Sequence, residues 1–364
     1  MRDSKPEVRD VVVRAVLAPM RLPLRTSSGA ITEAPLVLID LETTTGITGR
    51  AYLFAFTRGN LAPLASVVRG MAELIHGDAL APFEIEKKLR QRNTLLGVHN
   101  LVLMALSGID MAAWDAHAQH LDAPLACVLG GMLRPVRAYN SKGLGIMPAV
   151  DAAREARALV AEGFSAVKLR LGRASAQADI EVLRAVKDAI GPDVTLMCDF
   201  NQALTVNQAI LRGRMLDREG GLAWIEEPTR ADDLLGHARI AQALETPVQI
   251  GENFMGPEQM AQALAVSASD YVMPDAQRIG GVTGWMRAAA LAQGAGLEMS
   301  SHLFPEVSAH LLAVTPTCHW LEYVDWAAPI LEEPLLIEDS HVVCPSTAGS
   351  GIRWDEANVT KFAA

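Results

Sequence analysis

The sequence is poor in cysteine and in aromatic residues, and it lacks the marks of several protein classes. Its four cysteines lie far apart and form no CxxC pair, which favours free thiols in a reduced cytoplasmic protein over a disulfide scaffold. Even the apolar stretch 101–118 carries Asp110 and Asp115, so we expect no membrane span. Residues 1–10 contain no apolar segment, so we expect no signal peptide.

Positive charge is also scarce. Lysine and arginine number 32 against 42 aspartate and glutamate residues, giving a formal net charge of −10, and no basic stripe is present. We therefore expect no nucleic-acid partner. The 364 residues exceed what one ordinary core accommodates, and a large barrel with a smaller second domain fits that length.

The hydrophobic pattern divides the chain into two parts. In residues 1–130 we predict strands at 11–17 and 36–41, joined by a glycine-containing connector at 24–34, and helices at 61–75 and 100–120. Strands followed by helices indicate an α+β domain. We predict that the last segment, 329–364, returns to this domain.

Residues 131–328 repeat a unit of short apolar strand, loop and amphipathic helix. The clearest helices are 151–162 and 179–190, each followed by a glycine. The predicted strands are nearly continuous apolar runs, as parallel strands covered on both faces are: 138–141, 166–172, 194–199, 222–227, 248–252, 270–275, 297–302 and 318–322. Eight parallel strands alternating with helices predict an α/β fold containing a β/α-barrel.

Six of these strands end on a residue able to act in acid–base or metal chemistry. They follow one another by 27, 26, 23, 27 and 20 residues: Asp199, Glu226, Glu252, Asp275, His302 and Glu322. A single carboxylate at a strand end is usually a helix cap. Six in register predict instead that these side chains converge at the carboxyl-terminal face of the barrel, where barrel enzymes carry out their chemistry.

The first three of them predict a metal site. Asp199, Glu226 and Glu252 would bring about three negative charges together, which requires a neutralising cation. Three oxygen ligands leave room for water and substrate, a set that favours Mg²⁺, or Mn²⁺, over Zn²⁺.

The remaining strand-end residues predict acid–base chemistry on a carboxylate. Asp275 beside His302 would fix the imidazole tautomer and tune the ring as a general base near pH 7. Lys168 and Arg170 alternate onto one face of the second strand and would supply positive charge for a substrate carboxylate. We expect burial and like charge to hold Glu322 protonated, as a hydrogen-bond donor.

In combination, several segments resemble the mandelate racemase branch of the enolase superfamily. They are KxR at 168–170 followed by MCDFNQ, WIEEPT, IGEN, MPDAQRIGGVTGW, SSHLF and HWLE, together with APLVLIDL and GIDMAAWD in the first part. The resemblance implies a capping α+β domain over a modified (β/α)8 barrel, that is (β/α)7β, with Mg²⁺ on the three carboxylates. It further implies a homo-oligomer such as an octamer.

The resemblance also assigns roles to individual residues. It implies that Lys168 contacts the substrate carboxylate, that Asn201 contacts the α-hydroxyl, and that His302 is an acid/base oriented by Asp275. Glu322 would hydrogen-bond the carboxylate as it becomes an enediolate. Further substrate contacts are predicted for residues of the capping loop, the YLFAF segment and the first barrel strand: Leu24, Ser28, Ile31, Phe56 and Ser141.

One position departs from the mandelate racemase pattern and leaves three functions open. The second residue of the lysine pair is Arg170, and an arginine with a pKa of about 12.5 or more is a poor base. The mostly apolar predicted pocket favours racemisation of an aromatic or apolar 2-hydroxy acid. Dehydration of an acid sugar needs only His302. A carboxylate-binding protein without catalysis is the third possibility.

Overall fold

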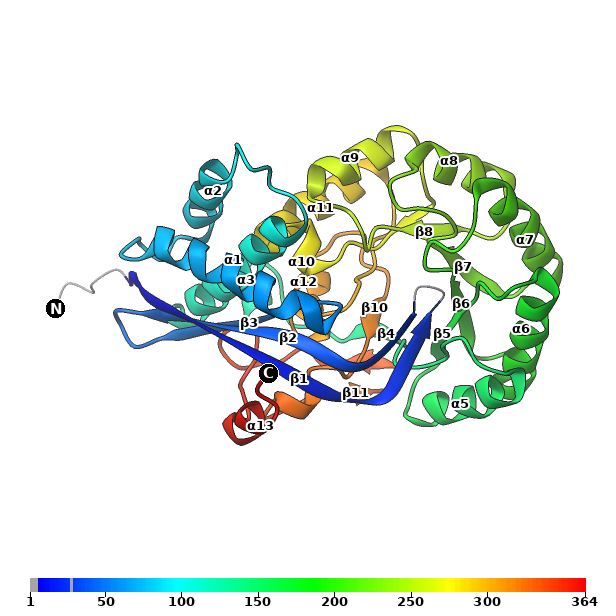
Figure 1. Cartoon of the computed structure of the whole chain (residues 1–364), viewed down its shortest axis with the longest axis horizontal. Coiled ribbons are helices and arrows are strands. Elements are labelled where there is room, and N and C mark those ends of the chain that lie inside the picture. The colour runs from blue at the N-terminus through cyan, green and yellow to red at the C-terminus, as the bar shows by residue number, and fades with distance from the viewer. Residues whose placement is uncertain (1–5, 27–28) are drawn as a thin grey trace.

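The computed structural model describes residues 6–26 and 29–364. Its first part is an antiparallel sheet covered on one side by helices (Figure 1). The strands are β1 (Val8–Thr26), β2 (Gly29–Thr43) and β3 (Thr48–Phe54), in that order across the sheet. The helices are α1 (Arg58–Ile75), α2 (Pro82–Arg92), α3 (Asn100–His120) and α4 (Leu125–Val128).

Helix α3 is the core of this capping domain, because most of its side chains are buried on every side. It approaches β3 so closely that a Cβ on Gly49 would lie 2.0 Å from the carbonyl oxygen of Ala112. The small residues of GIDMAAWD therefore allow the helix to lie directly against the sheet.

The sheet of the capping domain is larger than the sequence pattern predicts. Residues 24–26 and 29–34, within the predicted glycine-containing connector, instead extend β1 and β2, and Leu24 pairs with Ile31. Pro19 and Pro23 obscure the alternation there, and the register shifts between Pro19 and Leu24. Strand β3 and helix α2 were not predicted.

The second part is a parallel barrel with helices outside it (Figure 1). Its strands are β4 (Val136–Asn140), β5 (Ala166–Arg170), β6 (Thr195–Asp199), β7 (Leu222–Glu226), β8 (Val248–Ile250), β9 (Tyr271–Val272) and β10 (Leu321–Tyr323). Its helices are α5 (Ala149–Ala161), α6 (Ala176–Ile190), α7 (Val206–Glu219), α8 (Leu234–Ala243), α9 (Pro257–Ala265), α10 (Ala276–Ile279), α11 (Gly281–Ala295) and α12 (Pro305–Ala313).

The barrel closes because β10 pairs in parallel with β4. The segment 297–302 fills the seventh strand position with isolated bridges rather than a regular strand: Met299 bridges Val272 and Cys318, and His302 bridges Asp275. No helix separates β10 from β4 in the circle, so the architecture is the predicted (β/α)7β form of the barrel.

The C-terminal segment contacts both parts of the molecule. It contains η1 (Ala328–Ile330), β11 (Ile337–Glu338), β12 (His341–Val342) and α13 (Glu356–Lys361), and β12 pairs antiparallel with β4 of the barrel. Farther on, the Ser350 amide donates to Asp115 of α3 at 2.6 Å, and Trp354 donates to Asp40 of β2 at 2.7 Å.

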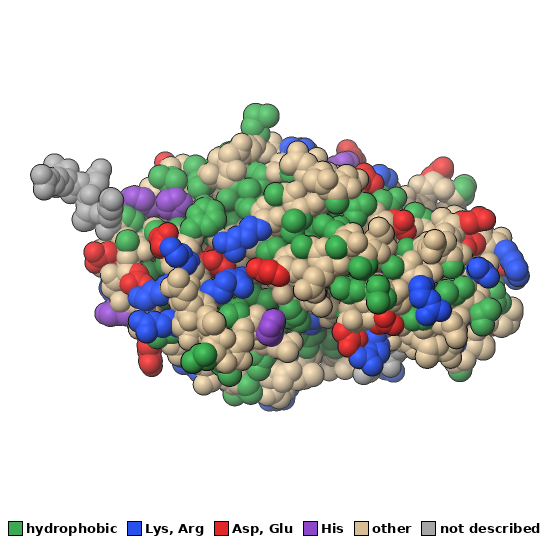
Figure 2. All heavy atoms as spheres, turned by 90° about the horizontal axis from the view of Figure 1, so that it is seen from above, with side chains coloured by type: hydrophobic (Ala, Val, Ile, Leu, Met, Phe, Trp, Pro, Cys, Tyr) green, Lys and Arg blue, Asp and Glu red, His purple; other side chains and the backbone are tan. Residues whose placement is uncertain are grey.

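No helix within the described residues is long and apolar enough to cross a membrane. On the face shown in Figure 2, basic and acidic side chains are interspersed over the surface rather than gathered into one patch.

Candidate active site

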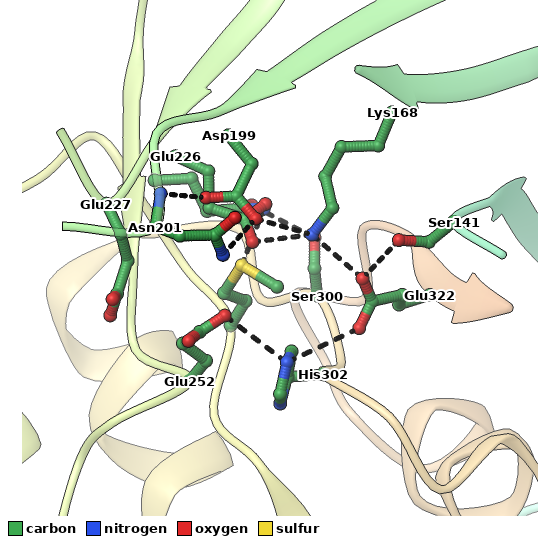
Figure 3. A network of polar contacts seen from close by, with 12 residues as sticks. Ser141, Lys168, Asp199, Asn201, Glu226, Glu227, Glu252, Ser300, His302 and Glu322 are labelled. Atoms are coloured by element: carbon green, nitrogen blue, oxygen red, sulfur yellow. Dashed lines mark hydrogen bonds and ion pairs between the residues drawn. The ribbon is translucent and has the colours of Figure 1, made fainter. Parts of the chain in front are cut away.

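The ends of β6, β7 and β8 bring three carboxylates together at one face of the barrel (Figure 3). Asp199, Glu226 and Glu252 each offer an oxygen within 4.8 Å of the others. Asp199 and Glu226 are buried, and Glu252 is half-buried. Burial raises the pKa of Glu226 to about 8, with Lys168 opposing the shift and the neighbouring carboxylates adding to it. A divalent cation would relieve this repulsion, so the donor set fits Mg²⁺.

Lys168 lies buried between the acidic cluster and the end of β10. Its Nζ is 2.6 Å from Glu226 Oε1, 2.8 Å from Glu322 Oε1 and 3.6 Å from Asp199 Oδ2. Burial alone would lower the pKa of Lys168, but Glu226 and Glu322 outweigh it and raise that pKa. The side chain is therefore a fixed positive charge beside the cluster.

His302 and Asp275 form the predicted pair. The imidazole Nδ1 lies 2.7 Å from Asp275 Oδ2, and Nε2 lies 3.2 Å from Glu252 Oε2 and 3.8 Å from Glu322 Oε2. Because a carboxylate only accepts, Nδ1 carries the proton. Burial lowers the pKa of His302, but Glu252, Glu322 and Asp275 together raise it to about 9, above the value near 7 that we expected.

The prediction that Glu322 is protonated is wrong. Burial alone would raise its pKa, but Lys168, His302 and Arg170 outweigh burial and lower the pKa well below its usual range. Three donors surround the carboxylate: Lys168 Nζ, Ser141 Oγ at 2.7 Å and the Leu303 amide at 2.9 Å. Glu322 is therefore an acceptor in this structure, because its attraction to Lys168 outweighs its desolvation.

Arg170 is buried and tied to the loop that follows β4. Its Nη1 donates to the carbonyl oxygens of Ser141 and Gly143, both at 2.9 Å, and its Nη2 donates to Ser141 Oγ at 2.8 Å. These bonds occupy three of its N–H groups and fix the guanidinium in place. Arg170 is therefore a buried, bonded charge and not a side chain at the solvated surface.

Two asparagines extend the hydrogen-bond network around the three carboxylates. Asn201, predicted to contact substrate, donates from Nδ2 to Asp199 Oδ2 at 2.8 Å. Asn253 donates from Nδ2 to both oxygens of Glu227, at 2.9 and 2.8 Å, and to Glu252 Oε1 at 3.1 Å. Glu227 thus lies outside the cluster, as Figure 3 shows, and is linked through Asn253 to Glu252, a predicted metal ligand.

A cavity of about 350 Å³ opens over these residues. Leu24, Ile31, Phe56 and Asn201, which we predict to contact substrate, are among the residues that line it. Ser28 falls outside the described residues. Ser141 is buried and is not among the residues that line the cavity; its hydroxyl bonds Glu322 and Arg170 instead.

The cavity also has lining residues that the sequence reasoning missed. They are the polar Thr26, Thr57, Gln202, Asn253 and Arg278, and the apolar Ala30, Phe54, Leu303 and Trp326. Two of them could have been found from the sequence, because Gln202 and Asn253 directly follow predicted site residues. The cavity therefore has a polar side as well as an apolar one, and it suits a small polar acid better than expected.

A (β/α)7β barrel with a capping domain and an acidic triad beside a histidine–aspartate pair defines a class of metal-dependent enzymes. Residues 8–130 match the N-terminal domain of mandelate racemase/muconate lactonizing enzymes, and residues 151–358 match the enolase C-terminal domain-like family. The chain belongs to this mandelate racemase/muconate lactonizing enzyme family of the enolase superfamily.

Among its relatives is an L-talarate/galactarate dehydratase from Salmonella typhimurium, 31% identical over 90% of this chain and 82% of the relative. Others are named cycloisomerases and racemases. An enolase from alpha proteobacterium bal199 with bound Mg is 44% identical, with a TM-score of 0.96 over 99% of this chain and 100% of that one. A Bradyrhizobium enolase with magnesium and mandelic acid is 42% identical, with a TM-score of 0.95 over 100% and 99%.

Proposed function

We propose that the chain removes the α-proton of a 2-hydroxycarboxylate with His302 as its single base, and that loss of a β-hydroxyl group as water completes the reaction. The observation that carries this is the contrast between the two candidate bases. His302 lines the cavity with its imidazole oriented by Asp275, whereas Arg170 has three of its N–H groups engaged in hydrogen bonds to Ser141 and Gly143.

Each residue has a physical role in that chemistry. Removing an α-proton beside a carboxylate places negative charge on the carboxylate oxygens, and Lys168 and Arg170 are fixed positive charges there. His302 takes the proton while Asp275 holds its tautomer, and the imidazolium then protonates the departing hydroxyl. When bound by the three carboxylates, Mg²⁺ would polarise the substrate carboxylate and offset the negative charge that raises the pKa of His302. The products are water and an enol, which becomes a 2-keto-3-deoxy acid.

The relatives support a polar substrate, and the polar lining of the cavity agrees with them. Racemisation of an aromatic or apolar 2-hydroxy acid is the second candidate, because Leu24, Ile31, Phe54, Phe56 and Trp326 form an apolar wall. The similarity to the Bradyrhizobium enolase that holds mandelic acid favours it as well. A racemase, however, must also return a proton to the opposite face of the substrate, and Arg170 is a poor group for that exchange.

Proton exchange with solvent tests the proposal. Both enantiomers of mandelate and a panel of 2,3-dihydroxy acids are incubated with the enzyme and Mg²⁺ in D2O, and α-deuteration is followed by NMR. We expect exchange in one configuration only, and a semicarbazide-reactive 2-keto-3-deoxy product from at least one dihydroxy acid. EDTA and His302→Asn should abolish both signals. Exchange of both mandelate enantiomers with loss of optical rotation would favour racemisation instead, and no exchange with any acid would contradict α-proton removal.

A further inference from the structure

Among the described residues, three lysine and arginine side chains line the cavity, and they differ in how their charge is satisfied. Lys168 has three carboxylates within 3.6 Å, and Arg170 directs its terminal nitrogens at two carbonyl groups and a hydroxyl. Arg278 donates from Nη1 to Asn253 Oδ1, and no carboxylate among residues 6–26 and 29–364 lies within ion-pair distance of it. Its Nε is buried without a hydrogen-bond partner.

We propose that Arg278 forms a second anion site in this cavity, one that takes the distal carboxylate of a dicarboxylic acid. The inference rests on the proposed function, in which the first carboxylate of the substrate lies beside Lys168. It extends that function by naming the substrate class, a small hydroxylated dicarboxylate.

The surroundings of Arg278 hold its guanidinium in place for such a contact. The group lies over the ring of Phe56, with its carbon 4.4 Å from the ring centroid, and the Asn253 amide fixes one of its nitrogens. At its base, the backbone amide donates to Asp275 Oδ1 at 3.1 Å. A planar guanidinium fixed in this way presents its remaining N–H groups to a carboxylate in a bidentate geometry.

The position of Arg278 suits the far end of a bound acid. It lies on α10 of the barrel and contacts Phe56, which follows β3 of the capping domain. Arg278 is therefore at the interface between the two domains. Lys168 is instead bonded to the acids that end β7 and β10. A cavity of about 350 Å³ is at the lower end of the range of about 300–1,000 Å³ for ligand pockets. It has room for a short acid, and both Lys168 and Arg278 line it.

A competing explanation is that Arg278 only balances the charge of the metal cluster. Asn253 connects it to Glu227 and Glu252, so its positive charge could support metal binding without touching substrate. The two explanations differ in what the loss of Arg278 changes: affinity for the second carboxylate of the ligand, or affinity for Mg²⁺.

Binding measurements in a His302→Asn background, which blocks proton removal, separate them. Isothermal titration in the presence of Mg²⁺ compares six-carbon hydroxylated dicarboxylates, galactarate among them, with the monocarboxylates of matching stereochemistry. We expect at least one dicarboxylate to bind more tightly than its partner. Arg278→Gln should weaken that dicarboxylate by about 10- to 100-fold and the monocarboxylate by less than about threefold. Arg278→Lys should retain part of the preference, and Arg184→Gln, on the exposed face of α6, should retain all of it.

Each other outcome overturns the proposal. Dicarboxylates that bind no better than monocarboxylates, or equal losses for both in Arg278→Gln, would show that no second anion site exists. A loss of Mg²⁺ affinity as the only effect would assign Arg278 to charge balance. Failure of the proposed function is seen separately, since the enzyme with His302 intact would then exchange no α-proton although the binding preference persists.

Discussion

Asp275 uses its two oxygens for different partners. Oδ2 is 2.7 Å from His302 Nδ1, while Oδ1 accepts from the backbone amides of Gln277 at 2.8 Å and Arg278 at 3.1 Å. One carboxylate therefore fixes both the candidate base and the start of α10. The orientation of the imidazole depends on a residue that has no contact with the cavity.

Replacing Asp275 by Asn should impair catalysis with little effect on the fold. The Asn side chain can still accept from the two amides, but its NH2 group would face Nδ1 and favour the tautomer with the proton on Nε2, which cannot act as a base. We expect kcat to fall by about 10²- to 10⁴-fold with KM nearly unchanged. Steady-state kinetics and circular dichroism measure this. The double variant with His302→Asn should be no slower than His302→Asn alone, and a kcat within threefold of wild type would contradict the role.

Ser141 is the second residue with two functional partners. Its hydroxyl donates to Glu322 Oε1 at 2.7 Å and accepts from Arg170 Nη2 at 2.8 Å. Ser141→Ala removes one bond from each, which at about 0.5–1.5 kcal/mol should lower kcat/KM by about two- to tenfold. Ser308→Ala is the matched control, because that hydroxyl is equally buried but bonds only the Leu303 carbonyl oxygen, at 3.0 Å. Equal kcat/KM in the two variants would argue against positioning by Ser141.

At the scale of elements, the short helix α10 joins the barrel to the capping domain. The fully buried side chain of Gln277 meets the backbone of Phe54 at the end of β3. Its Oε1 accepts from the Phe54 amide at 3.0 Å, and its Nε2 donates to the Phe54 carbonyl oxygen at 3.3 Å. The amide side chain thus bonds the outer edge of β3, whose other edge pairs with β2.

Gln277→Met should loosen this junction. It leaves two buried backbone groups unpaired, each at a cost of about 1–3 kcal/mol. Because Phe54 lines the cavity, we expect a higher KM together with a lower free energy of unfolding. Urea denaturation and steady-state kinetics measure the two effects, and Gln293→Met, exposed on α11, should change neither. A normal KM in a destabilised Gln277→Met protein would limit Gln277 to a structural role.

The polar residues at the strand ends of the barrel could be predicted from the sequence. Their hydrogen-bond and ion-pair partners could not. Polar residues such as Asp199 and His302 follow apolar strands at the spacing of the barrel unit, and that periodicity placed them on one face. The bonds of Arg170 to backbone carbonyls leave no pattern in the sequence. The charge of Glu322 depends on Lys168, which is far from it in the sequence, so burial and like charge predicted the wrong protonation state.

At the scale of the whole molecule, the two parts share a buried carboxylate. Asp110 of α3 accepts from the Thr283 amide at 2.9 Å and from the Thr283 hydroxyl at 2.6 Å, and Thr283 belongs to α11 of the barrel. The same hydroxyl accepts from Trp114 Nε1 at 2.9 Å. Burial raises the pKa of Asp110 from 3.8 to about 7, although the bonds from Thr283 oppose the shift.

This shift makes the stability of the molecule depend on pH. The folded protein holds the proton of Asp110 more tightly than the unfolded chain does, so the contribution is complete below pH 3.8 and is lost as the pH rises through about 7. Asparagine resembles the protonated carboxyl group and does not titrate. The free energy of unfolding of Asp110→Asn relative to wild type should therefore increase between pH 5 and pH 8, by at least about 1 kcal/mol. Urea denaturation at several pH values measures it, with Asp188→Asn, exposed on α6, as a control whose difference should stay constant. If the Asp110→Asn difference is also constant across this range, the carboxylate at the domain junction is already ionised at pH 5.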